Sequence, residues 1–207
     1  MSAVYDWWSR HPRALDALYA AAFLGRERRL RERSLAVLAP TAGERVLELG
    51  CGPGNSLSPL RERVGDAGAV VGVDASAGMV KTAREKASTW GNVHVVRGDA
   101  CRLPVSDGAV DAVYAAMSTS ATPAPAAVVR AAHDALRSGG RFVLLDAQPF
   151  QRWPARALNA VAIPVSRRLT DWVPEVDLAA TVRETFADST VETHNAGSIV
   201  IARGRKG

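Results

Sequence analysis

The chain has 207 residues, of which 47% are apolar and 23% charged, as in a globular domain with a buried core and unlike a disordered or fibrous chain. The formal net charge of +5 raises nucleic acid and anionic lipid as partners, but no separate RNA-binding module is visible. Two cysteines, Cys51 and Cys101, form neither a disulfide framework nor a zinc pattern, which favours a reducing cytoplasm.

The N-terminal part predicts helices. The first residues lack the apolar segment of a secretory signal, and no apolar run in the chain is long enough to span a membrane. Residues 5–38 predict two helices, because apolar side chains recur there at helical spacing. Five arginines between positions 26 and 33 alternate with Glu27 and Glu32, a pattern typical of a solvated helix face.

From residue 45 onward, short apolar runs alternate with helical patterns. We expect five strands at 45–50, 69–74, 93–98, 109–116 and 140–147, with helices after Asn55, from Ser76 to about Ser88, and from Pro125 to Leu136. A further helix is expected over 176–186. Two β-rich runs then flank Asn195, Ala196 and Gly197, which predicts an antiparallel hairpin. The result is a single α/β domain over 1–207 with a doubly wound, mostly parallel seven-stranded sheet and a C-terminal antiparallel hairpin.

The stretch VLELGCGPGN places three glycines directly after the first strand. Gly50, Gly52 and Gly54 allow positive φ and close approach of a ligand at the carboxyl edge of the sheet. Their G-x-G-x-G spacing differs from the G-x-G-x-x-G of dinucleotide-binding loops, which disfavours a nicotinamide dehydrogenase. Alone, such a loop also serves merely to connect a strand to a helix.

Acidic residues at three successive strands sharpen the interpretation. Asp74 ends the second strand, where a carboxylate accepts hydrogen bonds from ribose hydroxyls, and Asp99 follows the third, placed to accept from an adenine amino group. Glu48 lies inside the first strand, close to any cation held over the loop. Each acid alone has a structural alternative, but together they favour a positively charged adenosine ligand, S-adenosylmethionine.

In order and spacing, VLELGCGPGN, VVGVDAS…MV, VRGDACRLP and VDAVYAA resemble the binding motifs of class I S-adenosylmethionine-dependent methyltransferases over residues 40–147. The resemblance implies that the glycines line the methionine part, Asp74 holds the ribose, Asp99 and Ala100 bind adenine, and Met79 packs on its face. S-adenosylhomocysteine would be the product. The implied cofactor site comprises Glu48, Gly50, Cys51, Gly52, Gly54, Asn55, Asp74, Ala75, Met79, Asp99, Ala100 and Ala115.

The flanks YDWWSRHPRALDALYAAAFLGRERRL and GGRFVLLDAQPFQRWPARALN are similar to phospholipid N-methyltransferases and the related quinone C-methyltransferases. This resemblance implies a lipophilic acceptor: a lipid headgroup amine, a quinone or another lipophilic small molecule. We interpret residues 1–38 as a helical lid and 150–175 as a cap over the acceptor pocket. We assign Tyr5, Trp8, Tyr19, Ser118 and Trp153 to that pocket.

The catalytic residues are not defined by the sequence. Tyr5 and His11 are weak candidates for a general base, and His11 also fits a surface or capping role. Methyl transfer requires mainly alignment of the reactants, so a base is not obligatory. No group of residues has metal-ligand spacing, and we expect a metal-independent enzyme.

The segment 150–172 interleaves four arginines with aromatic and aliphatic residues. It fits a surface lying on an anionic membrane, which would make the cytoplasmic protein a peripheral one, and it equally fits a cap with a solvated outer edge. Pro154 and Pro164 are expected to prevent one long helix there, which argues against a simple amphipathic anchor. Three alternatives remain open: methylation of a soluble metabolite, transfer of the cofactor's aminocarboxypropyl group, and a nucleic-acid-binding protein.

Overall fold

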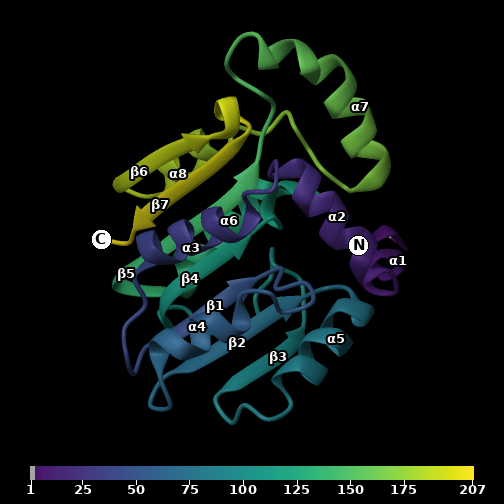
Figure 1. The fold of residues 1–207 in the computed structure, drawn as a ribbon. Coiled ribbons are helices and arrows are strands. Elements are labelled where there is room, and N and C mark those ends of the chain that lie inside the picture. Colours follow the sequence, from purple (N-terminus) through teal and green to yellow (C-terminus); the bar gives the residue numbers. More distant parts are fainter. Residues whose placement is uncertain (1–2) are drawn as a thin grey trace.

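A computed structural model describes residues 3–207, so the first two residues of the proposed lid lie outside the described residues. Seven strands form one sheet in the order β3-β2-β1-β4-β5-β7-β6 (Figure 1). They are β1 (Arg45–Leu49), β2 (Ala69–Asp74), β3 (Val93–Arg97), β4 (Val110–Ala116), β5 (Leu136–Ala147), β6 (Asp188–His194) and β7 (Ile199–Arg205). The first five are parallel, whereas β7 runs antiparallel to both neighbours. The predicted sheet with its reversed hairpin is therefore confirmed.

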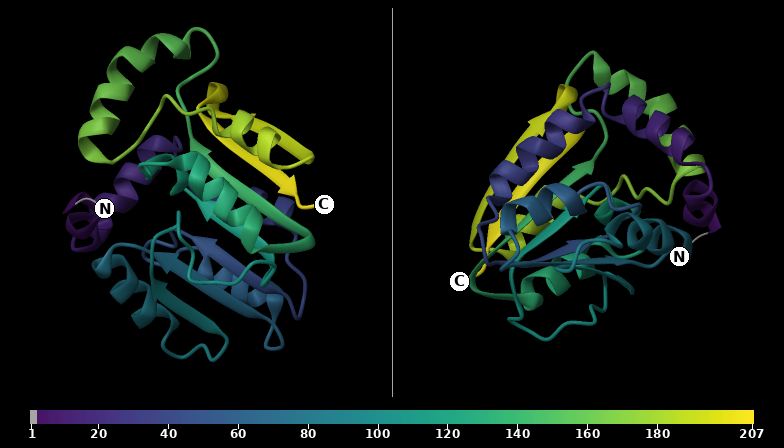
Figure 2. Two further views of the ribbon diagram at one scale, coloured as in Figure 1. Left: turned by 180° about the vertical axis from the view of Figure 1, so that it is seen from behind. Right: turned by 60° about the horizontal axis from the view of Figure 1, so that its bottom comes forward.

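Helices cover both faces of the sheet (Figure 2). The helices α3 (Glu27–Leu38), α4 (Leu57–Val64) and α5 (Ala77–Ala87) pack on one face, and α6 (Pro125–Ala135) and α8 (Leu178–Thr185) pack on the other. Side chains alternate along β1: Val46 joins the first core and Leu47 and Leu49 the second. This double burial explains why the strands appear in the sequence as short apolar runs.

The N-terminal part contains three helices before β1 instead of the two expected. They are α1 (Ala3–Ser9), α2 (Pro12–Ala22) and α3. Pro12 starts α2 at a position where its missing N–H costs nothing, and Leu24 and Gly25 end it with φ of +52° and +72°. The apolar periodicity continues across the first break, because α1 and α2 share the small core around Trp8, Leu15 and Met79.

Between β5 and α8 the chain forms the 3₁₀ turn η2 (Ala155–Leu158) and helix α7 (Asn159–Leu169), which Figure 1 shows standing away from the sheet. The helix continues through Pro164, so our expectation of an interruption there was wrong. Two contacts hold its ends. Asn159 exchanges two hydrogen bonds with the Phe150 backbone, both 2.9 Å, and Trp8 Nε1 donates to the Leu169 carbonyl at 2.8 Å. Short 3₁₀ turns also occur as η1 (Thr119–Ala121) and η3 (Asn195–Gly197).

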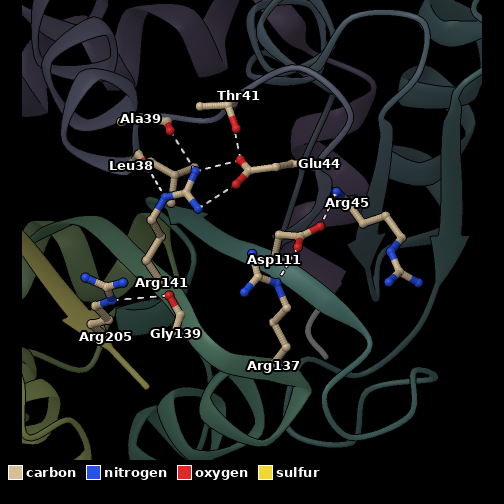
Figure 3. Close-up of polar contacts among 10 residues, drawn as sticks. All are labelled: Leu38, Ala39, Thr41, Glu44, Arg45, Asp111, Arg137, Gly139, Arg141 and Arg205. Atoms are coloured by element: carbon tan, nitrogen blue, oxygen red, sulfur yellow. Dashed lines mark hydrogen bonds and ion pairs between the residues drawn. The ribbon is translucent and has the colours of Figure 1, made fainter. Parts of the chain in front are cut away.

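The amino ends of the parallel strands are joined by a polar network (Figure 3). Arg141 Nη1 and Nη2 donate to both Glu44 carboxylate oxygens at 2.9 and 2.6 Å. The same guanidinium donates to the carbonyls of Leu38 and Ala39 at 2.5 and 2.6 Å. It thereby satisfies the last carbonyls of α3 and ties the α3–β1 connection to β5. This edge is stabilised by ion pairs, and the opposite, carboxyl edge is free to form a site.

Candidate cofactor and acceptor site

A cavity of about 540 Å³ lies at the carboxyl edge of the sheet, beneath α1 and α2. Its size is that of a pocket for a small organic ligand. Loops after four parallel strands and two N-terminal helices contribute to it, as expected at the point where the strand order reverses. Its lining residues are Tyr5, Asp6, Tyr19, Gly50, Gly52, Val73, Asp74, Ala75, Ser76, Met79, Arg97, Gly98, Asp99, Ala100, Met117, Ser118, Ala121, Thr122, Pro123 and Val128.

The glycine loop after β1 has a left-handed backbone at all three glycines. Gly50, Gly52 and Gly54 have φ of +61°, +53° and +80°. A Cβ on Gly50 would meet the Cβ of Ser118 at 2.3 Å, whereas a Cβ on Gly52 would meet nothing within 4 Å. Gly50 therefore permits contact between the β1 and β4 loops, and Gly52 leaves open space on the cavity side.

Asp74 organises the floor of the cavity from the end of β2. Its two carboxylate oxygens accept hydrogen bonds of 2.9 Å from the Gly52 and Ser76 N–H groups. Burial raises the pKa of this carboxyl, and the backbone donors oppose the shift. Each oxygen keeps a further lone pair for a ligand donor, so Asp74 is suited to accept from a diol.

The adenine-side residues predicted from the sequence also line the cavity. Asp99 is exposed, and its Oδ1 accepts from the Cys101 N–H at 2.9 Å, which orients the carboxylate in a local turn. Ala100 lies beside it, and Met79 closes the cavity from α5, where Ser76 caps the first turn by accepting from the Met79 N–H at 3.2 Å. The structure thus brings together the acidic residues of two strands and an apolar wall.

Sequence reasoning missed the contribution of Asp6. The Ser76 hydroxyl donates to Asp6 Oδ1 at 2.6 Å and lowers the pKa of this carboxyl. Gly78 permits the contact, since a Cβ there would meet Ser9 Oγ at 2.1 Å. No local pattern signals an interaction between residues 70 positions apart. Arg97, Met117 and Thr122 were missed as well, although they closely follow predicted strands.

Two tyrosines form the side of the cavity nearest the N-terminal helices. Burial is the main cause that raises the pKa of Tyr5 far above its usual range and that of Tyr19 to about 12. Nearby phenolic or acidic groups raise both pKa values further, whereas Arg31 lowers that of Tyr19. Both phenols are therefore neutral at physiological pH, which removes Tyr5 as a ready general base.

Five predicted cofactor residues do not line the cavity and support it from behind. Cys51 packs beneath β2, and Asn55 Oδ1 accepts from Lys86 Nζ at 3.1 Å. Glu48 shares the β1 face of Val46, not that of Leu47, and is buried near Arg31, with its Oε2 lacking a partner among the described residues. Burial raises the pKa of Glu48 to about 7, and Arg31 opposes the shift. The remaining two are Gly54 and Ala115.

The residues expected around the acceptor separate into two groups. Tyr5, Tyr19 and Ser118 line the cavity, and Ser118 Oγ donates to the Leu49 carbonyl at 2.7 Å. Trp8 is buried beside the cavity, where it contacts Leu169. Trp153 is 84% exposed and lies outside the cavity, because the chain leaves the sheet edge before η2.

His11 does not line the cavity. Its ring stacks on Trp7 with centroids 4.1 Å apart, and its Nδ1 lies 2.9 Å from the Trp7 carbonyl at the start of α2. Within residues 3–207 no cluster of three or more His, Cys, Asp or Glu residues could hold a metal ion, and no helix could cross a membrane. Metal independence itself stays a prediction.

The charge of the cavity distinguishes between nucleotide ligands. Three carboxylates, Asp6, Asp74 and Asp99, face one guanidinium, Arg97. An anionic pyrophosphate would be repelled there, whereas an adenosine bearing a sulfonium and an ammonium group would be attracted. The residues present therefore fit S-adenosylmethionine, which supplies an activated methyl group when bound. The exposed Asp99 fits the adenine end of this ligand, and the open space beside Gly52 fits its methionine end.

Comparisons with known proteins agree with this geometry. A family model described as a methyltransferase domain matches residues 46–140, from β1 into β5. The chain is 33% identical over 141 residues to an uncharacterised 37.1 kDa protein of a Streptomyces fradiae transposon, covering 68% of this chain and 40% of that protein. It is 31% identical over 116 residues to demethylmenaquinone methyltransferase of Staphylococcus aureus, covering 56% and 48%. The chain thus spans less than half the length of these relatives.

Solved structures share the fold over nearly the whole chain. A SAM-dependent methyltransferase of Thermotoga maritima superposes with a TM-score of 0.73 at 19% identity, covering 99% of this chain and 100% of that one. The methyltransferase complexed with the Trm112 activator in Haloferax volcanii gives 0.74 at 18% identity, with 98% of each chain covered. Strand order, motif order and these matches resemble those of class I S-adenosylmethionine-dependent methyltransferases. A methyltransferase-domain model matches the central part of the chain, and the solved structures show that the chain has the fold of such enzymes.

Proposed function

We propose that the protein binds S-adenosylmethionine in the 540 Å³ cavity and transfers its methyl group to a lipophilic acceptor. The acceptor class comprises lipid headgroup amines, quinones and similar lipophilic small molecules. The observation that supports it is the apolar and aromatic part of the cavity lining. Tyr5 and Tyr19 contribute to it from the N-terminal helices, and Met117, Ala121 and Pro123 contribute from the chain after β4. Such a wall desolvates an apolar body, while the acidic floor holds the cofactor.

Each part of the cofactor has a complementary group on the protein. Asp74 would accept from the ribose hydroxyls, Asp99 from the adenine amino group, and the Gly50–Gly52 backbone would accommodate the methionine part. Met79 would pack on the adenine face. Glu48 would act from behind the loop, through the charge it places near Arg31 and Ser56. S-adenosylhomocysteine would leave from the same contacts.

The chain's contribution to the reaction is alignment and exclusion of water. Positioning of two reactants can supply about 7–11 kcal/mol, and the raised pKa values of Tyr5 and Tyr19 disfavour both phenols as general bases. Because the two phenols are neutral, they would not remove a proton from the acceptor. This favours an acceptor that needs no base from the enzyme, such as an amine that loses its proton to water. The faces of the two phenols would also stabilise a cationic methylated amine, by about 0.5–2 kcal/mol.

The N-terminal helices and the segment 150–175 together form the proposed lid and cap. Trp8 joins them through its hydrogen bond to Leu169, and α1 is fixed to the cavity by Asp6 and Ser76. The similarity to demethylmenaquinone methyltransferase also supports a lipophilic acceptor. We therefore propose that the acceptor enters between α1, α2 and α7.

The test is incubation with trideuteromethyl-labelled S-adenosylmethionine and separate lipid, quinone and water-soluble extracts, followed by mass spectrometry. We expect mass-shifted products in the lipid or quinone extract, together with S-adenosylhomocysteine. Labelled products confined to the water-soluble extract would assign the protein to metabolite methylation. Methylthioadenosine as the product would instead indicate aminocarboxypropyl transfer.

A further inference from the structure

The exposed large apolar side chains are confined to the lid and cap. Among residues 3–207 there are seven of them, and all lie before residue 25 or between residues 153 and 169. Five lie between residues 153 and 169, and we call them the α7 face: Trp153, Leu158, Val161, Val165 and Leu169. Such a concentration is unusual on a protein surface and marks a site that contacts something apolar.

The α7 face is a continuous stripe. Leu158, Val161, Val165 and Leu169 follow one another at intervals of three or four residues, which places them on one side of the helix. Their exposed fractions range from 38% to 67%. The half-buried residues of α7, Asn159, Ala162, Ile163 and Ser166, lie on a different side, toward the rest of the protein. The stripe therefore lies beside the packed side of α7 and is exposed.

The charged residues within 148–170 all have one sign. From Gln148 to Thr170 the chain contains four arginines and no aspartate or glutamate. Arg152, Arg156, Arg167 and Arg168 are all exposed, and Arg167 also forms an ion pair with Glu175. An apolar stripe in a segment that also contains a tryptophan and several arginines is typical of helices that lie in the interface of an anionic bilayer.

We propose that the α7 face docks on the surface of a bilayer containing anionic lipids, with α7 lying in the plane of the headgroups. Arginine guanidinium groups would contact lipid phosphates, and the apolar stripe and Trp153 would enter the boundary of the acyl chains. A second copy of the chain is a poorer occupant, because two such faces would bring eight arginines together. That this surface delivers the acceptor to the cavity rests on the proposed function; the docking itself does not.

The experiment is flotation of the full chain with vesicles of phosphatidylcholine alone or of phosphatidylcholine and phosphatidylglycerol in equal parts. We expect binding to the anionic vesicles only, and its loss in high salt, because 1 M salt shortens the screening length to about 3 Å. Val161→Ser with Val165→Ser, and separately Arg156→Glu with Arg168→Glu, should each weaken binding at least about tenfold. Both pairs are exposed, so the fold should be unaffected.

The matched control is Arg28→Glu with Arg183→Glu, which changes net charge equally at exposed arginines on α3 and α8. It should retain at least half of the wild-type vesicle binding. If the control and the Arg156 pair lost vesicle binding equally, the loss would be explained by net charge alone, and the proposal would be overturned. Absence of binding to anionic vesicles would overturn it too, as would a concentration-dependent dimer abolished by the Val161 pair. Calorimetry with S-adenosylmethionine on the same samples distinguishes failed docking from failed cofactor binding.

Discussion

Gly50 lies so close to Ser118 that a Cβ at position 50 would approach the Ser118 Cβ to 2.3 Å. The loops after β1 and β4, which carry these two residues, form adjacent walls of the cavity. The Ser118 hydroxyl donates a hydrogen bond to the Leu49 carbonyl and so holds the two loops together. The geometry of the cavity therefore depends on the absence of a side chain at Gly50.

Gly50→Ala should destabilise the protein by at least about 2 kcal/mol more than Gly52→Ala. Both positions have positive φ, but only Gly50 lacks space for a methyl group, so the difference isolates the steric contact. Urea denaturation with the midpoints compared at constant slope measures it. Equal midpoints for the two variants would show that the β1 and β4 loops move apart easily.

Asp74→Asn should weaken S-adenosylmethionine binding by about 1–3 kcal/mol, a loss of roughly 5- to 150-fold. The Gly52 and Ser76 N–H groups each donate to a different oxygen of the carboxylate, and an amide keeps one acceptor but turns its NH2 group toward one of these two donors. Calorimetric titration provides the measurement. Asp111→Asn is the control, because Asp111 likewise accepts from a backbone N–H, that of Arg45, but at the other edge of the sheet. Similar losses in both variants would remove Asp74 from the site.

The stability of the protein should fall as pH rises from about 4.5 to about 7. The folded-state pKa of Glu48 is raised by burial to about 7, above its unfolded value, so the folded state binds a proton that the unfolded state releases. The stabilisation that comes from protonated Glu48 is fully present below the pKa of the unfolded state. It is lost as the pH rises through the pKa of the folded state, a change of up to about 3 kcal/mol. Glu48→Gln, which cannot ionise, should flatten this part of the profile in urea titrations. Parallel wild-type and variant profiles would contradict the assignment.

Arg141→Lys should cost about 1–3 kcal/mol of stability, because a lysine cannot reproduce the fork that contacts Glu44 and the end of α3 (Figure 3). Arg137→Lys serves as the comparison. The ion pair of Arg137 with Asp111 is half exposed, with 51% of the Arg137 side chain accessible. The Arg137→Lys substitution should therefore cost less than about 1 kcal/mol of stability. The reverse ranking in thermal or urea denaturation would contradict the role given to the network.

The sequence predicts those structural features of this protein that are determined by residues close together in the chain. The sheet and the cofactor loop follow from short patterns, such as glycines after a buried strand and Asp74 at a strand end, because neighbouring residues determine them. The orientation of Glu48 could have been inferred from its alternation with Leu47 and Leu49 along β1.

The arrangement of the proposed lid, by contrast, is determined by contacts between residues far apart in the sequence. Asp6 reaches Ser76 only because Gly78 lets α1 approach α5, and Trp8 reaches Leu169 across 161 positions of sequence. Periodicity within residues 5–38 contains no information on such partners, so it also concealed the break before Pro12. Trp153 was expected in the acceptor pocket because the tryptophans concentrate in the two flanking segments, yet it is exposed on the α7 face.

The central proposal is that the acidic cavity under α1 and α2 binds S-adenosylmethionine. Calorimetric titration of the wild-type protein with S-adenosylmethionine, S-adenosylhomocysteine and NAD tests it most directly. We predict that the first two bind with one site per chain and that NAD, with its pyrophosphate facing Asp6, Asp74 and Asp99, does not. Binding of NAD with no heat from either adenosyl ligand would contradict the account.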